Sequence, residues 1–417
     1  MTNFDNTLEF ARSLDAKDQL AKFRHQFYFP KLNGKDAIYL TGNSLGLQPK
    51  TATAALEQEL KDWQDYGVEG HFHGKNPWFH YHKFLTEKAA KVVGALPQEV
   101  VVMNNLTVNL HLMMVSFYRP TATRYKIIME AGAFPSDQYA MESQVRFHGF
   151  NPADAIIEVS PREGEYHLRT EDIIETINKN ANETALVMFS GVQYYTGQAF
   201  DVEAITKAGH DKGITVGFDL AHAAGNLHLK LHDWNVDFAV WCGYKYLNSG
   251  PGGVSGVFVN ERFANAPELP RFAGWWGHKE DERFLMKKGY IPEYGAAGWQ
   301  LSNAPVLTMA VHNASLQIFE EAGMENLTNK SKLLTAYLQF VLEQSGKDLK
   351  IITPSDQRGC QLSILTDANG KDLFKHLQNH GIIADWREPN VIRMAPVPLY
   401  NSFEDVWRVG EALRGFD

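Results

Sequence analysis

An aspartate and a lysine stand at the carboxyl ends of two short apolar segments in the middle of the chain. Asp219 ends the segment 214–219, and Lys245 follows the segment 238–242. If both segments are parallel strands, their carboxyl ends meet at one edge of the sheet, and both side chains can enter one crevice. A lysine amine can form a Schiff base with pyridoxal 5′-phosphate (PLP), and a carboxylate can keep its pyridine nitrogen protonated. The pair therefore predicts a PLP site.

The same two residues have a simpler structural explanation. An aspartate at a strand end often caps the next helix, and a lysine is most often a surface residue. The two residues alone favour this explanation, so the flanking segments have to decide.

Three flanking segments favour the cofactor, although each has an ordinary reading when it is taken alone. Residues 248–253 (NSGPGG) let the backbone turn tightly beside a ligand, but they match neither a Walker loop nor GxGxxG. Residues 104–107 (NNLT) open a helix-like run, and the free amides of a helix start suit a phosphate ester. Residues 134–137 (FPSD) offer a ring that could stack on the cofactor and a second carboxylate.

Longer strings resemble the kynureninase family, PLP enzymes of the aspartate-aminotransferase fold group, from Tyr39 to about Phe403. The strings GNSLGLQP (42–49), GWWGH (274–278) and APVPLYNS (395–402) are the most specific. The resemblance also rests on FPSD (134–137), FSGVQYYTGQ (189–198), DLAH (219–222) and GYKYLN (243–248).

The resemblance implies a role for each of a set of residues. The catalytic residues would be Lys245, which carries PLP and shuttles the α-proton, Asp219 at the pyridine nitrogen, and Tyr244 as a proton relay. The cofactor would be bound by Leu106, Thr107, Phe134, Ser136, Asp137, Ser190, Asp219, His222, Tyr244, Lys245, Trp275 and Asn303. The substrate would be bound by Ser44, His71, Asn303 and Arg393, with the guanidinium of Arg393 on the α-carboxylate.

The resemblance further implies an activity and an assembly. The activity would be PLP-dependent hydrolysis of L-kynurenine or 3-hydroxykynurenine to anthranilate or 3-hydroxyanthranilate and L-alanine, in tryptophan catabolism. Trp275 and Asn303 would reach the site of the neighbouring subunit, so a homodimer with shared active sites is expected.

Other functions compete with this interpretation. A second PLP lyase or aminotransferase could share the fold, but a cysteine desulfurase needs a mobile cysteine, and Cys242 and Cys360 resemble buried apolar residues. A non-catalytic PLP-binding regulator usually carries a DNA-binding module, for which little sequence precedes residue 42. A catalytically inactive homologue is disfavoured by the intact set Lys245, Asp219 and Arg393. Two HxH pairs, at 71–73 and 80–82, have no carboxylate or cysteine pattern beside them, so no metal site is predicted.

The elements expected around these residues indicate an α/β protein of the PLP-dependent transferase fold type I. Strand-like segments alternate with helix-like ones such as 170–178 and 201–210, which predicts a mainly parallel mixed sheet. The expected strands are 125–130, 155–159, 186–190, 214–219, 238–242 and 254–259. After residue 305 two long helices (306–321 and 330–344) lead into short strands, which predicts a smaller α+β C-terminal domain. We expect an N-terminal segment (1–50) packed with the small domain, a large PLP-binding domain (51–305) and a small domain (306–417).

Size and charge agree with an enzyme acting on a small molecule. At 417 residues the chain exceeds the length at which one core stops growing, so two domains are expected. The formal net charge of -9 argues against nucleic-acid binding, which needs a basic surface. No apolar run is long enough to span a membrane, and the acidic start of the chain does not resemble a signal peptide. A cytoplasmic location is therefore expected.

Overall fold

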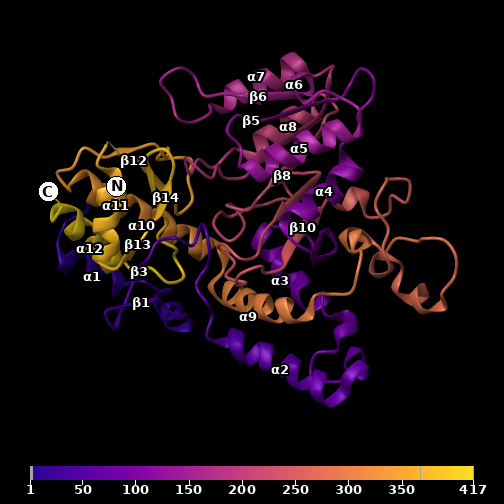
Figure 1. The fold of residues 1–417 in the computed structure, drawn as a ribbon, viewed down its shortest axis with the longest axis horizontal. Coiled ribbons are helices and arrows are strands. Elements are labelled where there is room, and N and C mark those ends of the chain that lie inside the picture. The colour runs from indigo at the N-terminus through magenta and orange to yellow at the C-terminus, as the bar shows by residue number, and fades with distance from the viewer. Residues whose placement is uncertain (1–2, 367, 417) are drawn as a thin grey trace.

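A seven-stranded mixed sheet forms the larger part of the molecule in the computed structural model, which describes residues 3–366 and 368–416 (Figure 1). Its strands, in spatial order, are β4 (Val100–Met103), β10 (Ser255–Val259), β9 (Phe238–Trp241), β8 (Thr215–Asp219), β7 (Thr184–Ser190), β5 (Lys126–Glu130) and β6 (Ile156–Val159). The strands from β9 to β6 are parallel, and β10 is antiparallel to both of its neighbours. The predicted α/β class with a mainly parallel sheet is confirmed. Six strands were expected, and the short strand β4 was missed.

Alternate residues of each strand enter two different cores, because the side chains of a strand point to opposite faces. Val187 and Phe189 of β7 belong to one core, whereas Leu186 and Met188 belong to the other. The first core also includes α3 (Lys83–Val93), α7 (Thr170–Asn180), α8 (Val202–His210) and α9 (Val306–Ala322). The second is covered by α4 (Leu106–Phe117), α5 (Pro135–Phe147) and the short α6 (Pro152–Ala155). Burial on both faces explains why these strands read as continuous apolar runs.

A four-stranded antiparallel sheet lies beside the large one and has a core of its own (Figure 1). Its spatial order is β11 (Lys350–Ile351), β12 (Leu362–Leu365), β15 (Val391–Met394) and β14 (Asp385–Arg387). The helices packed with it are α1 (Leu8–Asp15), α10 (Met324–Glu343), α11 (Gly370–Asn379) and α12 (Phe403–Arg414). This is the α+β pattern expected after residue 305.

The N-terminal residues contact both parts of the molecule. Strand β3 (Ile38–Tyr39) pairs in parallel with β13 (Ile382–Ile383), and a small hairpin, β1 (Lys31–Leu32) and β2 (Lys35–Asp36), precedes it. Helix α9 packs against α2 (Thr51–Tyr66) and shares the core of the large sheet. The division of the chain at residues 50 and 305 stays a prediction.

The turn at Gly46 fastens the N-terminal segment to the loop that carries Lys245. The amide of Gly46 donates to the carbonyl of Tyr244 at 2.9 Å. A Cβ atom at position 46 would overlap the carbonyl oxygen of Lys245 and the side chain of Asn248. Only glycine therefore allows this close approach.

Among the described residues, no helix combines the length and the apolar character that crossing a membrane requires.

We expect Gly46→Ala to destabilise the protein by about 1–3 kcal/mol, the usual cost of forcing an extra methyl group into a packed site. The measurement is the midpoint of urea unfolding. Gly415→Ala is the matched control, because a Cβ there would meet its nearest atom, the Ala412 carbonyl oxygen, at an ordinary 3.6 Å. Equal midpoints for the two variants would contradict the tight contact at Gly46.

Candidate active site

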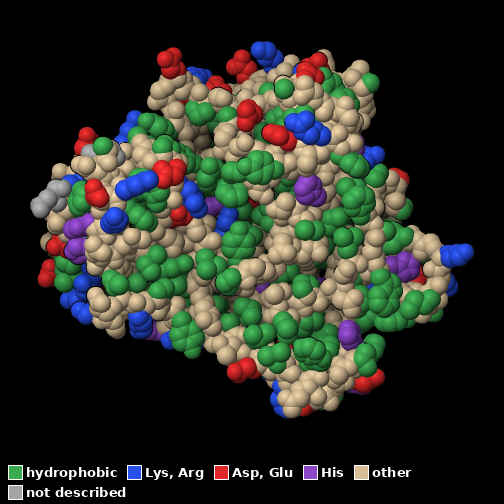
Figure 2. Space-filling model, viewed as in Figure 1, with side chains coloured by type: hydrophobic (Ala, Val, Ile, Leu, Met, Phe, Trp, Pro, Cys, Tyr) green, Lys and Arg blue, Asp and Glu red, His purple; other side chains and the backbone are tan. Residues whose placement is uncertain are grey.

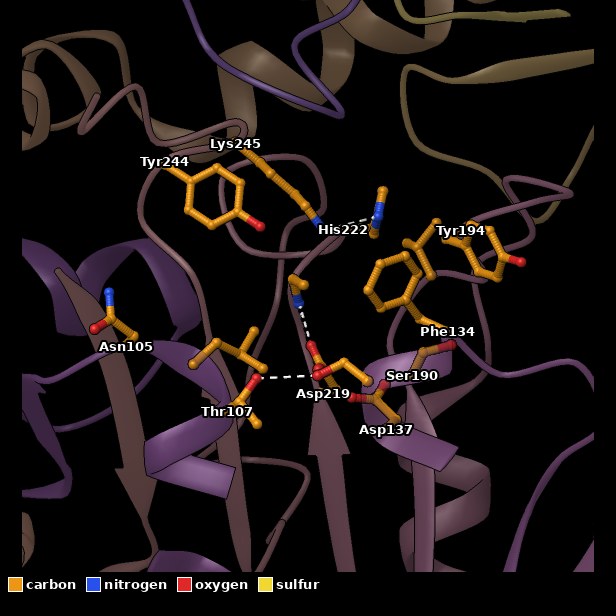
Figure 3. A pocket seen from close by; sticks show the side chains of 14 residues that line it. Asn105, Thr107, Phe134, Asp137, Ser190, Tyr194, Asp219, His222, Tyr244 and Lys245 are labelled. Carbon is orange, nitrogen blue, oxygen red and sulfur yellow. Dashed lines mark hydrogen bonds between the residues drawn. The ribbon is translucent and has the colours of Figure 1, made fainter. Parts of the chain in front are cut away.

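A cavity of about 690 Å³, open to solvent, lies where the carboxyl ends of the parallel strands meet α4 and α5 (Figure 3). Ten of the predicted cofactor-binding residues line it: Leu106, Thr107, Phe134, Ser136, Asp137, Ser190, Asp219, His222, Tyr244 and Lys245. Residues up to 139 positions apart along the chain (Leu106 and Lys245) thus share one cavity, with a volume in the range of small-molecule sites.

The parallel sheet is what brings several of these side chains together. Ser190 ends β7 and Asp219 ends β8, and the two residues are register partners across the ladder. Glu130 ends β5, on the other side of β7, and accepts hydrogen bonds from the Ser190 hydroxyl (2.5 Å) and amide (3.2 Å). Burial raises the pKa of Glu130 to about 7. Three neighbouring strand ends therefore form one connected polar row.

Asp219 and Asp137 form a buried pair of carboxyl groups. Burial raises the pKa of both, and the negative charge of Asp219 raises that of Asp137 further. Asp219 is stabilised as an anion by the Ala221 amide, which donates at 2.7 Å, and by the nearby charge of Lys245. Because two adjacent carboxylates cannot both ionise easily, the proton resides on Asp137 and the charge on Asp219.

Lys245 enters the cavity from the loop after β9 and is 8% exposed. Its Nζ lies 3.0 Å from Nε2 of His222 and 5.6 Å from the centre of the Phe134 ring. Burial, together with the charges of Lys245, Arg393 and Arg387, lowers the pKa of His222 well below its usual value. His222 is therefore neutral and accepts the hydrogen bond of the lysine amine.

The start of α4 offers an anion site at the other end of the cavity (Figure 3). Asn105 precedes the helix but makes no side-chain capping bond, so the first amides of α4 keep their free hydrogens. The hydroxyls of Thr107 and Ser136 lie 3.0 Å apart beside this helix end. Free amides, two hydroxyls and a helix dipole together suit a phosphate ester.

Arg393 and Ser44 meet next to the cavity, in a cluster that includes a carboxylate. Arg393 is 1% exposed and donates to the carbonyl of Tyr194 at 2.7 Å, to the Ser44 hydroxyl at 3.2 Å and to the carboxylate of Asp385. Ser44 also donates to Asp385. Since Tyr194 lines the cavity, this cluster lies at its wall.

Besides Ser44 and Arg393, which lie next to the cavity, three further predicted residues do not line it within one chain. His71, in the short helix η2 (Gly67–His71), contacts the Val68 carbonyl at 3.0 Å. Trp275 is 44% exposed, and its indole donates to the carbonyl of Arg283. Asn303 is exposed on the surface. The roles of these residues stay predictions.

Residues outside the predicted set also shape the site. Tyr194 lines the cavity, and its ring packs edge-on against that of Phe134 with the ring centres 5.2 Å apart. Glu130, Asp385 and Arg387 were not expected either. The position of Glu130 at the end of a predicted strand was a usable signal, whereas only the pairing of β14 with β15 places Asp385 beside Arg393.

Solved structures with the same fold were found. The protein C-DES, in a mutant form with glycine covalently linked to the PLP cofactor, matches with a TM-score of 0.77 and 17% identity. The match covers 94% of this chain and 99% of that chain. The apo cysteine desulfurase of Thermococcus onnurineus NA1 matches with a TM-score of 0.75 and 18% identity, over 91% and 94% of the two chains. The predicted fold type I of PLP-dependent enzymes is confirmed.

Sequence relatives and a family model give a closer relationship. The model of the kynureninase C-terminal domain matches residues 327–413. The kynureninases of Christiangramia forsetii and Flavobacterium psychrophilum are 57% and 55% identical to this chain, over 99% of it and 98% of each relative. The kynureninase of Nematostella vectensis is 50% identical over 96% of this chain and 92% of its own. With such identity along nearly its whole length, this chain belongs to the kynureninase family.

Proposed function

We propose that this protein is a kynureninase that hydrolyses L-kynurenine or 3-hydroxykynurenine. Water is added across the bond between the side-chain carbonyl and the β-carbon, which gives anthranilate or 3-hydroxyanthranilate and L-alanine. The observation that carries the proposal is the meeting of Lys245, the buried Asp219 and the start of α4 in one cavity. The near full-length identity to kynureninases supports the choice of reaction.

The residues present fit PLP, the cofactor of the family. Asp219 supplies a buried anion, Thr107 and Ser136 lie beside free helix amides, and Lys245 supplies an amine. Buried polar atoms without a protein partner, Nδ1 of His222 among them, also belong to residues that line this cavity. When bound, PLP supplies an aldehyde that takes up an amine and a ring that accepts electrons from the bonds of the attached amino acid.

We assign the proton transfers at the substrate to Lys245 and its neighbours. The neutral His222 can accept a hydrogen bond from the amine of Lys245, and it adds no second positive charge beside that amine. Tyr244 lines the same cavity, and burial raises the pKa of its hydroxyl, so the phenol keeps its proton and can donate it. The two residues therefore support Lys245 from different directions.

We assign Asp219 to the pyridine nitrogen and Arg393 to the α-carboxylate of the substrate. The anion of Asp219 favours a protonated ring, which increases the electron demand of the cofactor. Arg393 lies at the wall of the cavity, and its planar guanidinium suits a carboxylate. The two assignments orient the substrate between β8 and β15.

The exposed apolar surface of one chain supports a homodimer with shared sites. Residues between β10 and α9 project from the sheet, and Figure 2 shows hydrophobic side chains gathered over this segment, at the right of the view. The exposed ones include Phe272, Trp275, Phe284, Leu285, Met286, Ile291 and Tyr294. A patch of this kind marks an interaction surface. We infer that a second copy covers it and receives Trp275 and Asn303 at its own cavity, with His71 near the aryl ring.

The rival reading as a cysteine desulfurase is disfavoured by the state of the thiols. Burial raises the pKa of Cys242, and that of Cys360 to about 12. Both cysteines are buried, so neither can present a mobile thiolate to a substrate.

The proposal also includes a cytoplasmic location for the protein.

We expect the purified protein, loaded with PLP, to form anthranilate and alanine in equal amounts from L-kynurenine. Lys245→Ala should remove both turnover and the visible absorbance of the bound cofactor, because no protein amine then holds it. Anthranilate fluorescence and an alanine assay measure the products. The exposed Lys207→Ala is the matched control and should behave as wild type. A fully active Lys245→Ala variant would contradict the assignment.

The two carboxyl groups should respond differently to conversion into amides. Asp219→Asn removes the anion at the pyridine nitrogen, and we expect kcat to fall about 100-fold or more. Asp137→Asn replaces a group that is already protonated, so kcat should stay within about tenfold of wild type. Steady-state kinetics at neutral pH decides, and a greater loss for Asp137→Asn would reverse the assigned proton position.

Shared sites predict complementation between two inactive chains. We expect Lys245→Ala and the double variant Trp275→Ala, Asn303→Ala each to have little activity. After the two are unfolded and refolded together, half of the dimers are mixed, and each mixed dimer has one intact site. Activity should therefore recover to about a quarter of wild type. Recovery no greater than the sum of the two parents would contradict a site built from two chains.

A further inference from the structure

Asp385 is hydrogen-bonded to Arg393, the residue proposed to bind the substrate's α-carboxylate. It pairs across the ladder with Arg393, on the neighbouring strand β15, and accepts hydrogen bonds from that arginine and from the Ser44 hydroxyl. The side chain of Asp385 is only 12% exposed, and that of Arg393 only 1%. One guanidinium nitrogen of Arg393, Nη2, therefore already serves an internal carboxylate.

A second arginine, Arg387, lies on the same strand as Asp385, β14, and contacts the same carboxylate. Arg387 of β14 donates to Asp385 at 3.2 Å, and its side chain remains 38% exposed. The Nε atoms of Arg387 and Arg393 are buried and have no hydrogen-bond partner in the protein. Two arginines thus surround one carboxylate, and both keep unused donors.

The charges of this cluster leave room for one further anion. Arg387 and Arg393 carry two positive charges and Asp385 carries one negative charge, so the group is positive by one unit. The charges of both arginines reach His222, which lines the cofactor cavity, and help to lower its pKa. Tyr39 and Ser44 are the other groups that face Asp385, and both are neutral as phenol and hydroxyl. One carboxylate from a ligand would complete the balance.

We propose that Asp385 and Arg387 set the affinity of this site for the substrate's α-carboxylate. Asp385 holds Arg393 while the site is empty, and it shifts onto Arg387 when a ligand carboxylate takes its place on Arg393. Both residues are positioning and specificity residues, since they act through Arg393. The proposal rests on the proposed function only in taking Arg393 as the carboxylate-binding residue.

The exchange has a thermodynamic consequence for binding. A ligand carboxylate must displace Asp385 from Arg393, which costs free energy. The apparent affinity is therefore the intrinsic affinity multiplied by the fraction of molecules in which Arg393 is free. Arg387 reduces that penalty because it gives the displaced carboxylate a second cation. Removing the charge of Asp385 and removing that of Arg387 should therefore change affinity in opposite directions.

The test uses L-alanine, which carries an α-carboxylate but no aryl ketone, and L-alaninamide, which lacks the carboxylate. Each is titrated into the PLP-loaded protein and followed by the absorbance of the cofactor. For Asp385→Asn we expect the Kd of L-alanine to fall up to about tenfold. For Arg387→Gln we expect it to rise about threefold. The double variant should bind L-alanine as tightly as Asp385→Asn, because Arg387 has no displaced carboxylate to receive once the charge of Asp385 is removed. The Kd of L-alaninamide should not change.

Weaker binding of L-alanine to Asp385→Asn would overturn the proposal, because it would mean that Asp385 only holds Arg393 in place. If Asp385→Asn does not fold, Arg387→Gln decides, since its half-exposed side chain is not part of a core. An unchanged Kd of L-alanine in that variant would also overturn the proposal. L-Alanine has no aryl ketone, so a protein that binds it as expected but fails to cleave kynurenine would refute the proposed function and leave this inference standing.

Discussion

Burial of the Asp219 carboxylate at the end of β8 is the constraint on which the rest of the site depends. A carboxylate removed from water is costly unless hydrogen bonds and opposite charge replace the lost solvation. The Ala221 amide, the protonated Asp137 and the charge of Lys245 supply that replacement. Each of these groups comes from a different segment, so the stability of one anion requires β8, α5 and the lysine loop to lie in one arrangement.

The two sheets divide the remaining tasks between them. The large sheet places its strand ends and the start of α4 around the cofactor cavity. The small sheet supplies Arg393, and the N-terminal turn supplies Ser44, so the proposed site for the substrate's carboxylate lies where three parts of the chain converge. The contact of Gly46 with the lysine loop couples the N-terminal turn to the same point. Motion of one part against another would alter cofactor and substrate binding together.

Charge is distributed unevenly around the cavity. Carboxyl groups lie at the strand ends near Asp219, and arginines lie on the side of β14 and β15. The neutral His222 stands between them, because burial and three nearby cations keep it deprotonated. In the proposed function, this arrangement gives a zwitterionic amino acid a preferred direction, with its carboxylate toward the arginines and its reacting carbon toward Lys245.

The local pattern of the sequence determined the elements and most of the cofactor site. Apolar runs ending in Ser190 and Asp219 predicted strands, and family strings predicted ten residues that line one cavity. Strand β4 was missed because four apolar residues carry little signal of their own. The position of the proton on Asp137, the neutrality of His222 and the hold of Asp385 on Arg393 were decided only by the tertiary structure. Each of them depends on burial and on charges from distant segments, and such distances are set by packing, not by spacing along the chain.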